Sequence, residues 1–191
     1  MTAMVTMPPA TTERCRLLLQ RWRQDLRLTR REQGLLRGEL TLLDRQLQRL
    51  EHNVLRLAVF GRVGVGKSSL INALVGQRLL ETDVAHGSTR RQQAVTWPLK
   101  LDGLQRVELI DTPGIDEIDA AGRTRLATRV AMGVDLVLLV IDSDLTRCDR
   151  DALETLQASG KPVRLVLNRS DRWPGEQLPE LLASIRSRPV S

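Results

Sequence analysis

The first part of the chain carries a helical pattern of apolar side chains. Residues 13–52 contain no Pro and are rich in Leu, Arg, Gln and Glu. Apolar positions recur there at alternating spacings of three and four from Leu19 to Leu50, as in a heptad seam. We therefore expect a long helix that either packs on another part of the protein or pairs with a second copy as a coiled coil. Gly34 and Gly38 permit a bend in its middle, which favours packing or a helical hairpin.

Beyond Asn53 the pattern changes to short apolar runs separated by amphipathic stretches. Buried strands are predicted at residues 54–60, 93–101, 105–111, 134–142 and 163–168. Helices are predicted at residues 69–75, 117–132, 148–159 and 176–187. The dipeptide Asp102-Gly103 is a hairpin-turn signal, so one edge of the sheet is expected to be antiparallel. Strands that alternate with helices predict an α/β fold with a mainly parallel sheet.

These patterns divide the chain into three expected parts. Residues 1–12 are small, contain Pro and lack periodicity, so they predict a disordered tail. Residues 13–53 form the helical segment, and residues 54–191 form the α/β domain. The formal net charge is +6, and between Thr12 and Arg56 eleven Arg stand against six Asp and Glu. Such a segment suits the solvated face of a helix, or contact with nucleic acid or an anionic membrane surface.

Composition excludes several classes of function. With three Trp, one Phe and no Tyr, the chain cannot build an interleaved aromatic platform for single-stranded nucleic acid. Cys15 and Cys148 are too few for a disulfide framework or a cysteine zinc site, and they suit a reduced, cytoplasmic protein. No apolar run approaches the roughly 18–20 residues of a membrane span, and the start lacks the pattern of a secretory signal.

A glycine-rich loop supplies the strongest chemical signal. Gly61-x4-Gly66-Lys67-Ser68 matches the phosphate-binding pattern between a predicted strand and a predicted helix. Glycines let backbone N–H groups converge on phosphate oxygens, and the helix directs its positive end towards them. Lys67 can bridge the β- and γ-phosphates, and the Ser68 hydroxyl can bind Mg²⁺. The loop therefore predicts binding of a nucleoside triphosphate.

Two later motifs each follow a predicted strand. In Asp-Thr-Pro-Gly at 111–114, the carboxylate of Asp111 can hold a water of the magnesium shell, and the Gly114 amide can meet the γ-phosphate. In Asn-Arg-Ser-Asp at 168–171, the last carboxylate can accept two hydrogen bonds from the N–H groups of guanine. Adenine offers no such pair of donors, so this motif predicts selection of guanine.

With these motifs in this order, the chain resembles the Era-like P-loop GTPases of the translation-factor-related class. The bacterial and cyanobacterial type is the most similar, including members in which the GTP-binding domain is one part of a longer, membrane-associated protein. The resemblance covers about residues 54–188. It implies a three-layer P-loop NTPase sandwich, GTP and GDP as ligands, and Mg²⁺ as the metal.

The resemblance also implies roles for individual residues. Catalysis is expected of Lys67, Thr89 and Gly114, and Mg²⁺ binding of Ser68, Thr89 and Asp111. Thr89 is the threonine of the first switch, and Ser88 replaces it if the alignment shifts by one residue. Nucleotide contacts are expected from Gly61, Arg62, Val63, Gly64, Val65, Gly66, Lys67, Ser68, Ser69, Asp111, Thr112, Pro113, Gly114, Asn168, Arg169 and Asp171.

Several positions depart from the family pattern. Arg169 stands where the guanine motif usually has Lys, and its aliphatic stem can still stack on the base. Ile115 follows Gly114 where many GTPases carry a water-orienting Gln, which implies slow hydrolysis or water positioned by another group. The last strand and helix of the fold and the final guanine-contacting loop are not visible before Ser191, so we expect a C-terminally incomplete domain.

Other charged residues near the motifs admit two interpretations. Arginines close to the phosphates are candidates for a charge-stabilising finger, or else are simply solvated: Arg62, Arg90 and Arg91. An acidic cluster suggests a second metal, or else helix capping and a solvated loop: Asp142, Asp144, Asp149 and Asp151.

The function predicted from the sequence is a molecular switch that binds GTP·Mg²⁺ and hydrolyses it slowly to GDP and phosphate. The N-terminal helix is expected to bind an effector or a second copy. Three alternatives stay open. The first is a dynamin-like GTPase at the periphery of a membrane, the second a ribosome- or RNA-associated GTPase, and the third a nucleotide-binding pseudoenzyme.

Overall fold

A computed structural model describes residues 9–81, 93–116 and 118–187. The chain divides into two compact units. One comprises Met1–Leu55 with Leu99–Arg106, and the other comprises Arg56–Pro98 with Val107–Ser191. Among the described residues, no helix combines the length and the apolar character needed to cross a membrane.

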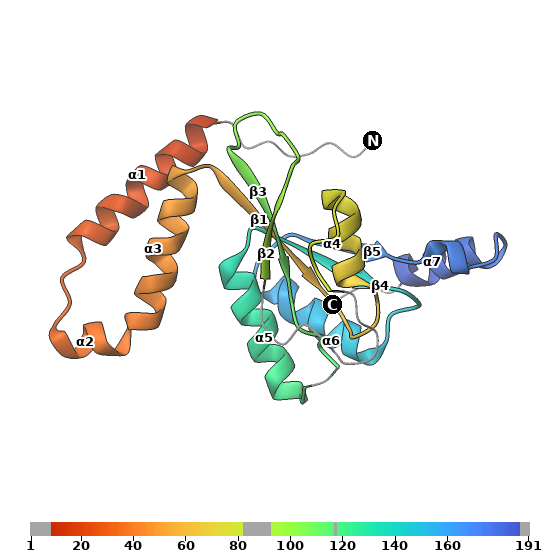
Figure 1. Cartoon of the computed structure of the whole chain (residues 1–191). Coiled ribbons are helices and arrows are strands. Elements are labelled where there is room, and N and C mark those ends of the chain that lie inside the picture. The colour runs from red at the N-terminus through yellow and green to blue at the C-terminus, as the bar shows by residue number, and fades with distance from the viewer. Residues whose placement is uncertain (1–8, 82–92, 117, 188–191) are drawn as a thin grey trace. The chain divides into compact units, whose positions relative to one another are not determined.

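The first unit contains a helical hairpin (Figure 1). Helix α1 (Pro9–Asp25) and helix α3 (Arg37–Glu51) lie side by side, joined by a bend that contains the short helix α2 (Arg30–Leu35). The expectation of one long helix over residues 13–52 is therefore wrong, and the helical hairpin that the glycines favoured is confirmed. The helix also begins at Pro9, inside the stretch expected to be a disordered tail; residues 1–8 lie outside the described residues.

The helix is interrupted twice, before Thr29 and again at Leu36. Leu36 lies between Gly34 and Gly38, so the break that these two glycines permit is confirmed. Thr29 forms a capping box, in which its hydroxyl accepts from the Glu32 backbone N–H while the Glu32 carboxylate accepts from the Thr29 backbone N–H at 2.8 Å. These bonds satisfy two helix-terminal donors, so a new helix starts here. The hydrogen bonds from Thr29 also hold the pKa of the Glu32 carboxyl below its usual value.

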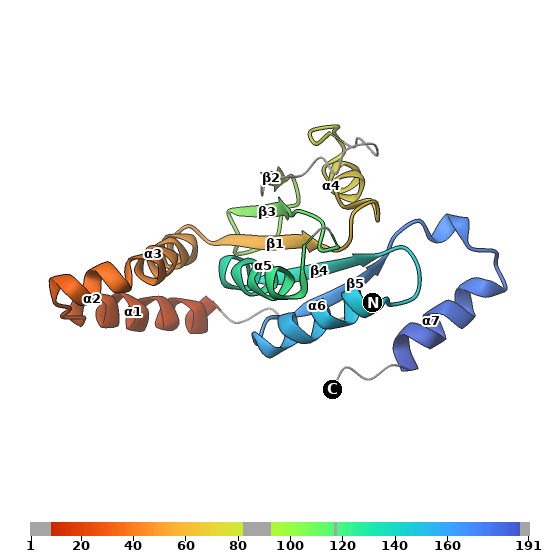
Figure 2. The ribbon, with the colours of Figure 1, turned by 90° about the horizontal axis from the view of Figure 1, so that it is seen from below.

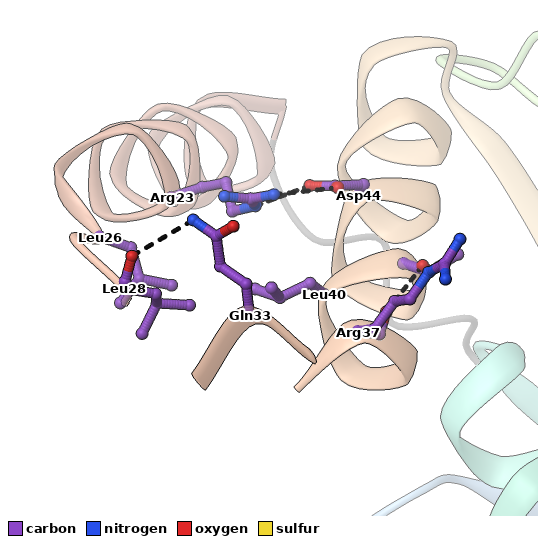
Figure 3. A pocket seen from close by; sticks show the side chains of 8 residues that line it. Arg23, Leu26, Leu28, Gln33, Arg37, Leu40 and Asp44 are labelled. Carbon is purple, nitrogen blue, oxygen red and sulfur yellow. Dashed lines mark hydrogen bonds and ion pairs between the residues drawn. The ribbon is translucent and has the colours of Figure 1, made fainter. Parts of the chain in front are cut away.

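The heptad seam is only partly buried in this hairpin. On α3 Leu47 is buried, whereas on α1 Leu19 and Trp22 are exposed. At the bend, Arg23 donates to Asp44 across the two helices at 2.8 Å, and the hairpin encloses a hollow of about 370 Å³ (Figure 3). Polar contacts thus help to join α1 to α3, and much of the apolar surface of α1 faces outward.

The second unit is an α/β sandwich. Its sheet has the order β2-β3-β1-β4-β5, visible in Figure 2. The strands are β1 (Val54–Phe60), β2 (Gln93–Trp97), β3 (Arg106–Asp111), β4 (Leu136–Ile141) and β5 (Val163–Leu167). Strands β1, β4 and β5 pair in parallel, while β2 and β3 form the antiparallel pair that the Asp-Gly turn predicts. The predicted α/β fold class is confirmed.

Helices cover both faces of this sheet. Helices α5 (Ala120–Gly133) and α6 (Arg147–Ala158) lie on one face and α4 (Lys67–Val75) on the other (Figure 1). The 3-10 turn η1 (Ser170–Arg172) and helix α7 (Gln177–Ser187) follow β5. The core is aliphatic around a single aromatic side chain, Phe60, and includes Leu139 and Leu156. In the described ranges β5 is an outer strand, with Leu165 exposed.

The two cysteines lie in different environments, and this difference can be tested. Cys15 on α1 is exposed, whereas Cys148 on α6 is partly buried, with its thiol 3.8 Å from the Ile115 carbonyl oxygen. Burial raises the pKa of the Cys148 thiol, and nearby Arg123 offsets this only in part. A raised pKa leaves less thiolate at neutral pH, and the thiolate is the reactive form.

We therefore expect iodoacetamide at neutral pH to alkylate Cys15 at least about tenfold faster than Cys148. Peptide mass spectrometry over a time course measures both rates in one sample. Raising the pH should accelerate alkylation of Cys148. Equal rates at neutral pH would contradict the burial of its thiol.

Candidate phosphate and base site

The glycine-rich loop lies between the end of β1 and the start of α4, as predicted. Gly61 packs so closely on the Val140 carbonyl oxygen of β4 that a Cβ would collide with it. Gly66 adopts a φ of +91°, a left-handed conformation that favours glycine, and a Cβ there would collide with the Asn168 side chain. Each glycine therefore permits a close approach by a neighbouring element.

Ser68 and Asp111 meet at the start of α4. The Ser68 hydroxyl donates to Asp111 Oδ2 at 2.7 Å, and Asp111 is 1% exposed at the end of β3. The sequence motifs are 43 positions apart, and the fold brings together the two residues expected at the metal. Thr89, the third expected ligand, and its alternative Ser88 lie outside the described residues.

This donor set fits Mg²⁺. A hydroxyl and a carboxylate are hard oxygen ligands, and Mg²⁺ commonly keeps several waters and binds substrate phosphates alongside one or two protein oxygens. In the described part of the chain, no cluster of three or more His, Cys, Asp or Glu side chains could hold a metal without such help. Asp142 and Asp149 of the acidic cluster instead pair with Arg62.

Lys67 crosses the loop that precedes it. Its side chain is largely buried, and Nζ donates to the Arg62 carbonyl oxygen at 2.7 Å. This contact keeps the ammonium group beside the backbone of the loop, where a phosphate would sit. Ser69, the following residue, is exposed.

The second switch motif is anchored to the same loop. Thr112 is fully buried and donates through Oγ1 to the Val59 carbonyl oxygen at 2.8 Å. Gly114 packs against Val63 with no space for a Cβ. The Ile115 N–H donates to the Gly61 carbonyl oxygen at 3.3 Å, and the Ile115 side chain lies in the hydrophobic core. Because this side chain is buried, it cannot orient a water at the phosphates.

Asp116 is a site residue that the sequence did not reveal. Its Oδ1 accepts from the Val63 backbone N–H at 2.6 Å, which places a carboxylate on one of the amides of the phosphate loop. Backbone amides of such loops bind phosphate oxygens. In the sequence, Asp116 is marked only by its place two positions after Gly114. Acidic residues are common in loops, so this place alone does not predict a role.

The guanine motif is held against the phosphate loop. Asn168 donates from Nδ2 to the Val65 carbonyl oxygen at 2.8 Å. Arg169 adopts a left-handed backbone conformation with φ +55°, and Asp171 lies exposed in the turn η1. The structure therefore joins the predicted base and phosphate motifs, with Asn168 as a direct link.

The guanidinium of Arg62 pairs with two carboxylates. The group is bound by Asp142 at 3.1 Å and by Asp149 at 3.2 Å. This paired arrangement differs from both interpretations of Arg62, a finger and a simply solvated side chain. The other two candidates, Arg90 and Arg91, lie outside the described residues. Asp149 also closes a capping box with Thr146 at the start of α6, so the capping interpretation of this acidic residue is confirmed.

Comparison with known proteins identifies the family. Residues 56–169 match the model of the family described as 50S ribosome-binding GTPase. The GTPase Der of Rhizobium johnstonii is 43% identical over 121 residues, which cover 60% of this chain and 25% of that protein. The GTPase Era of Synechocystis sp. is 38% identical over 135 residues, which cover 67% of this chain and 41% of that protein.

A solved structure supports the same assignment. Era in complex with MgGDPNP and nucleotides 1506–1542 of 16S ribosomal RNA superposes with a TM-score of 0.59 at 25% identity, covering 70% of this chain and 47% of that one. The chain thus spans less than half the length of these relatives. From its fold, its motifs and the matching family model, the chain belongs to the Era-like P-loop GTPases, in the family described as 50S ribosome-binding GTPase.

Proposed function

We propose that this protein acts as a molecular switch that binds GTP with Mg²⁺ and hydrolyses GTP slowly to GDP and phosphate. The observation that carries the proposal is the hydrogen bond between Ser68 and Asp111 at the start of α4, next to a phosphate loop that the guanine motif also contacts. One arrangement thereby supplies the metal ligands, the phosphate cradle and the base motif.

The residues of the chain take distinct roles in this proposal. Lys67 stabilises negative charge on the transferred phosphoryl group, and the Gly114 N–H donates to the γ-phosphate. Ser68 and Asp111 hold the metal, which neutralises charge on the phosphate oxygens when bound. Asp171 accepts from guanine, and the stem of Arg169 stacks on the base. Thr89 completes the metal site in the first switch.

Slow turnover follows from the buried Ile115. Its side chain lies in the core, so no side chain at this position orients the attacking water. The water is therefore held by the backbone or by a partner protein. A slow GTPase differs from a pseudoenzyme in its response to a partner. A partner that supplies the missing water-orienting group would raise the rate of GTP hydrolysis only in the slow GTPase.

Competition against a fluorescent GDP derivative tests nucleotide binding. We expect GTP and GDP to displace the probe and ATP not to, in the presence of Mg²⁺. Asp171→Asn should weaken GDP binding by at least about tenfold, because two hydrogen bonds to a charged acceptor are altered. Asp102→Asn, a change in the exposed hairpin turn, serves as the control. Equal displacement by ATP and GTP would contradict guanine selection.

A second function is favoured by the outward face of α1. Leu17, Leu18 and Trp22 are 45%, 59% and 53% exposed, and the exposed Arg14 and Arg21 flank them. Apolar side chains beside arginines suit the surface of an anionic membrane, where a cytoplasmic protein would bind peripherally. RNA contact would use the arginines without the leucines, although Era contacts 16S ribosomal RNA in its solved complex. Pairing with an effector or with a second copy through the heptad seam would use the leucines without the arginines.

Sedimentation with lipid vesicles tests the membrane contact. The protein should bind vesicles of phosphatidylcholine with phosphatidylserine, and binding should fall with added salt. Replacing Leu18 and Trp22 together by Ser should weaken binding by about tenfold or more, since their apolar area no longer enters the lipid. Leu35→Ser on α2, where Leu35 is 73% exposed, is the control. Salt-sensitive binding to RNA that survives the double substitution would favour the RNA alternative.

The contact between Asp116 and the phosphate loop predicts a gain of affinity. A phosphate must displace this carboxylate to reach the Val63 N–H, so Asp116→Asn should raise the affinity for GDP by about threefold, most clearly at low salt. Fluorescence titration measures the change. Asp119→Asn changes a carboxylate that caps the start of α5, so it should leave the affinity unchanged. A loss of affinity in Asp116→Asn would mean that the carboxylate supports the loop.

A further inference from the structure

Two arginines from separate motifs converge on one carboxylate. Asp142 follows β4, and its Oδ1 accepts from Arg62 Nη2 at 3.1 Å while its Oδ2 accepts from Arg169 Nη1 at 3.3 Å. Arg62 belongs to the phosphate loop, and Arg169 belongs to the guanine motif. The side chain of Asp142 therefore bridges the two halves of the nucleotide site.

The arginine of the phosphate loop is fixed from a second side. Arg62 Nε lies 3.3 and 3.2 Å from the two carboxylate oxygens of Asp149. Asp149 is completely buried, and it also accepts from the Thr146 hydroxyl and backbone N–H. Burying a carboxylate is costly unless such partners pair with it. Arg62 is thus held in place by Asp149, and Asp142 links it to Arg169.

The guanine motif is held by the same residue, Asp142. Arg169 has a left-handed backbone conformation that non-glycine residues rarely adopt, so neighbouring contacts must maintain it. Its guanidinium binds the Asp142 carboxylate, and the indole Nε1 of Trp173, four residues later, donates to the Asp142 carbonyl oxygen at 3.3 Å. Asp142 therefore contacts both sides of the turn that carries Asp171.

We propose that Asp142 is a positioning residue that couples guanine recognition to phosphate binding through Arg62 and Arg169. The inference rests on the proposed GTP-binding function and adds a residue outside the recognised motifs. The two arginines and two carboxylates, Asp142 and Asp149, form a charge-balanced cluster. Without the charge of Asp142, Arg62 keeps only Asp149 as a carboxylate partner, and Arg169 loses the ion pair that holds its guanidinium.

Competition of GDP and ADP against a fluorescent nucleotide tests this coupling. Asp142→Asn should lower the affinity for GDP by about tenfold and change the affinity for ADP by less than about twofold. Arg62→Gln should cause a similar loss of preference for GDP, although Arg62 lies on the phosphate loop. The double variant should be no worse than the poorer single variant, because both changes break one link.

The control is Asp151→Asn, which removes a carboxylate of the same acidic cluster whose recorded ion pair, at 3.8 Å, is with Arg123. It should keep the preference for GDP. If Asp142→Asn does not fold, as judged by circular dichroism, Arg169→Met tests the same link. It keeps the apolar stem, removes the charge, and should also lower the preference.

The outcomes separate the two proposals. If the unsubstituted protein shows no preference for GDP over ADP, the proposed function fails, and this inference fails with it. If that preference exists and survives in Asp142→Asn, the coupling alone is wrong. Proportional losses for GDP and ADP, or additive losses in the double variant, would reduce Asp142 to a structural role and overturn the proposal.

Discussion

The site depends on how closely other elements approach the phosphate loop. The carbonyl of Val140 packs on Gly61, the amide of Asn168 packs on Gly66, and Val63 packs on Gly114. At each contact a Cβ would collide with its neighbour, so the glycines let the backbone take the position at which its amides can face an anion. The phosphate loop thereby fixes the positions of β4, the guanine motif and the second switch relative to one another.

Because the site depends on close packing, its local motifs could be predicted from the sequence, whereas the contacts between those motifs could not. Ser68 and Asp111 could be predicted because each belongs to a short pattern with a known chemical task. Asp116 and Asp142 carry no pattern of their own. Their importance arises from contacts across 53 and 80 positions of sequence, to Val63 and Arg62, which only the folded chain provides. Sequence periodicity predicts elements, whereas side-chain contacts between loops depend on how those elements pack.

The helical segment shows the opposite case, because a local signal in the sequence marks one of its breaks. The apolar repeat runs through this break, where Thr29 and Glu32 form a capping box whose residue types and spacing are visible in the sequence. The heptad count also suggested that one apolar face would be buried. Instead Leu47 on α3 is buried while Trp22 on α1 is exposed, because a hairpin gives each helix a different environment. Short-range hydrogen bonds therefore overrode a long-range apolar repeat.

The anchoring of Ile115 limits which part of the second switch can move. Its N–H donates to Gly61, its carbonyl lies 3.8 Å from the Cys148 thiol, and its side chain is in the core, so the backbone is held on three sides. Asp116, the next residue, is exposed and accepts from the Val63 N–H of the loop. Ile115 is therefore a fixed point between Gly114 and the exposed Asp116. The second switch motif is thus tied both to the phosphate loop and to the core of the α/β unit.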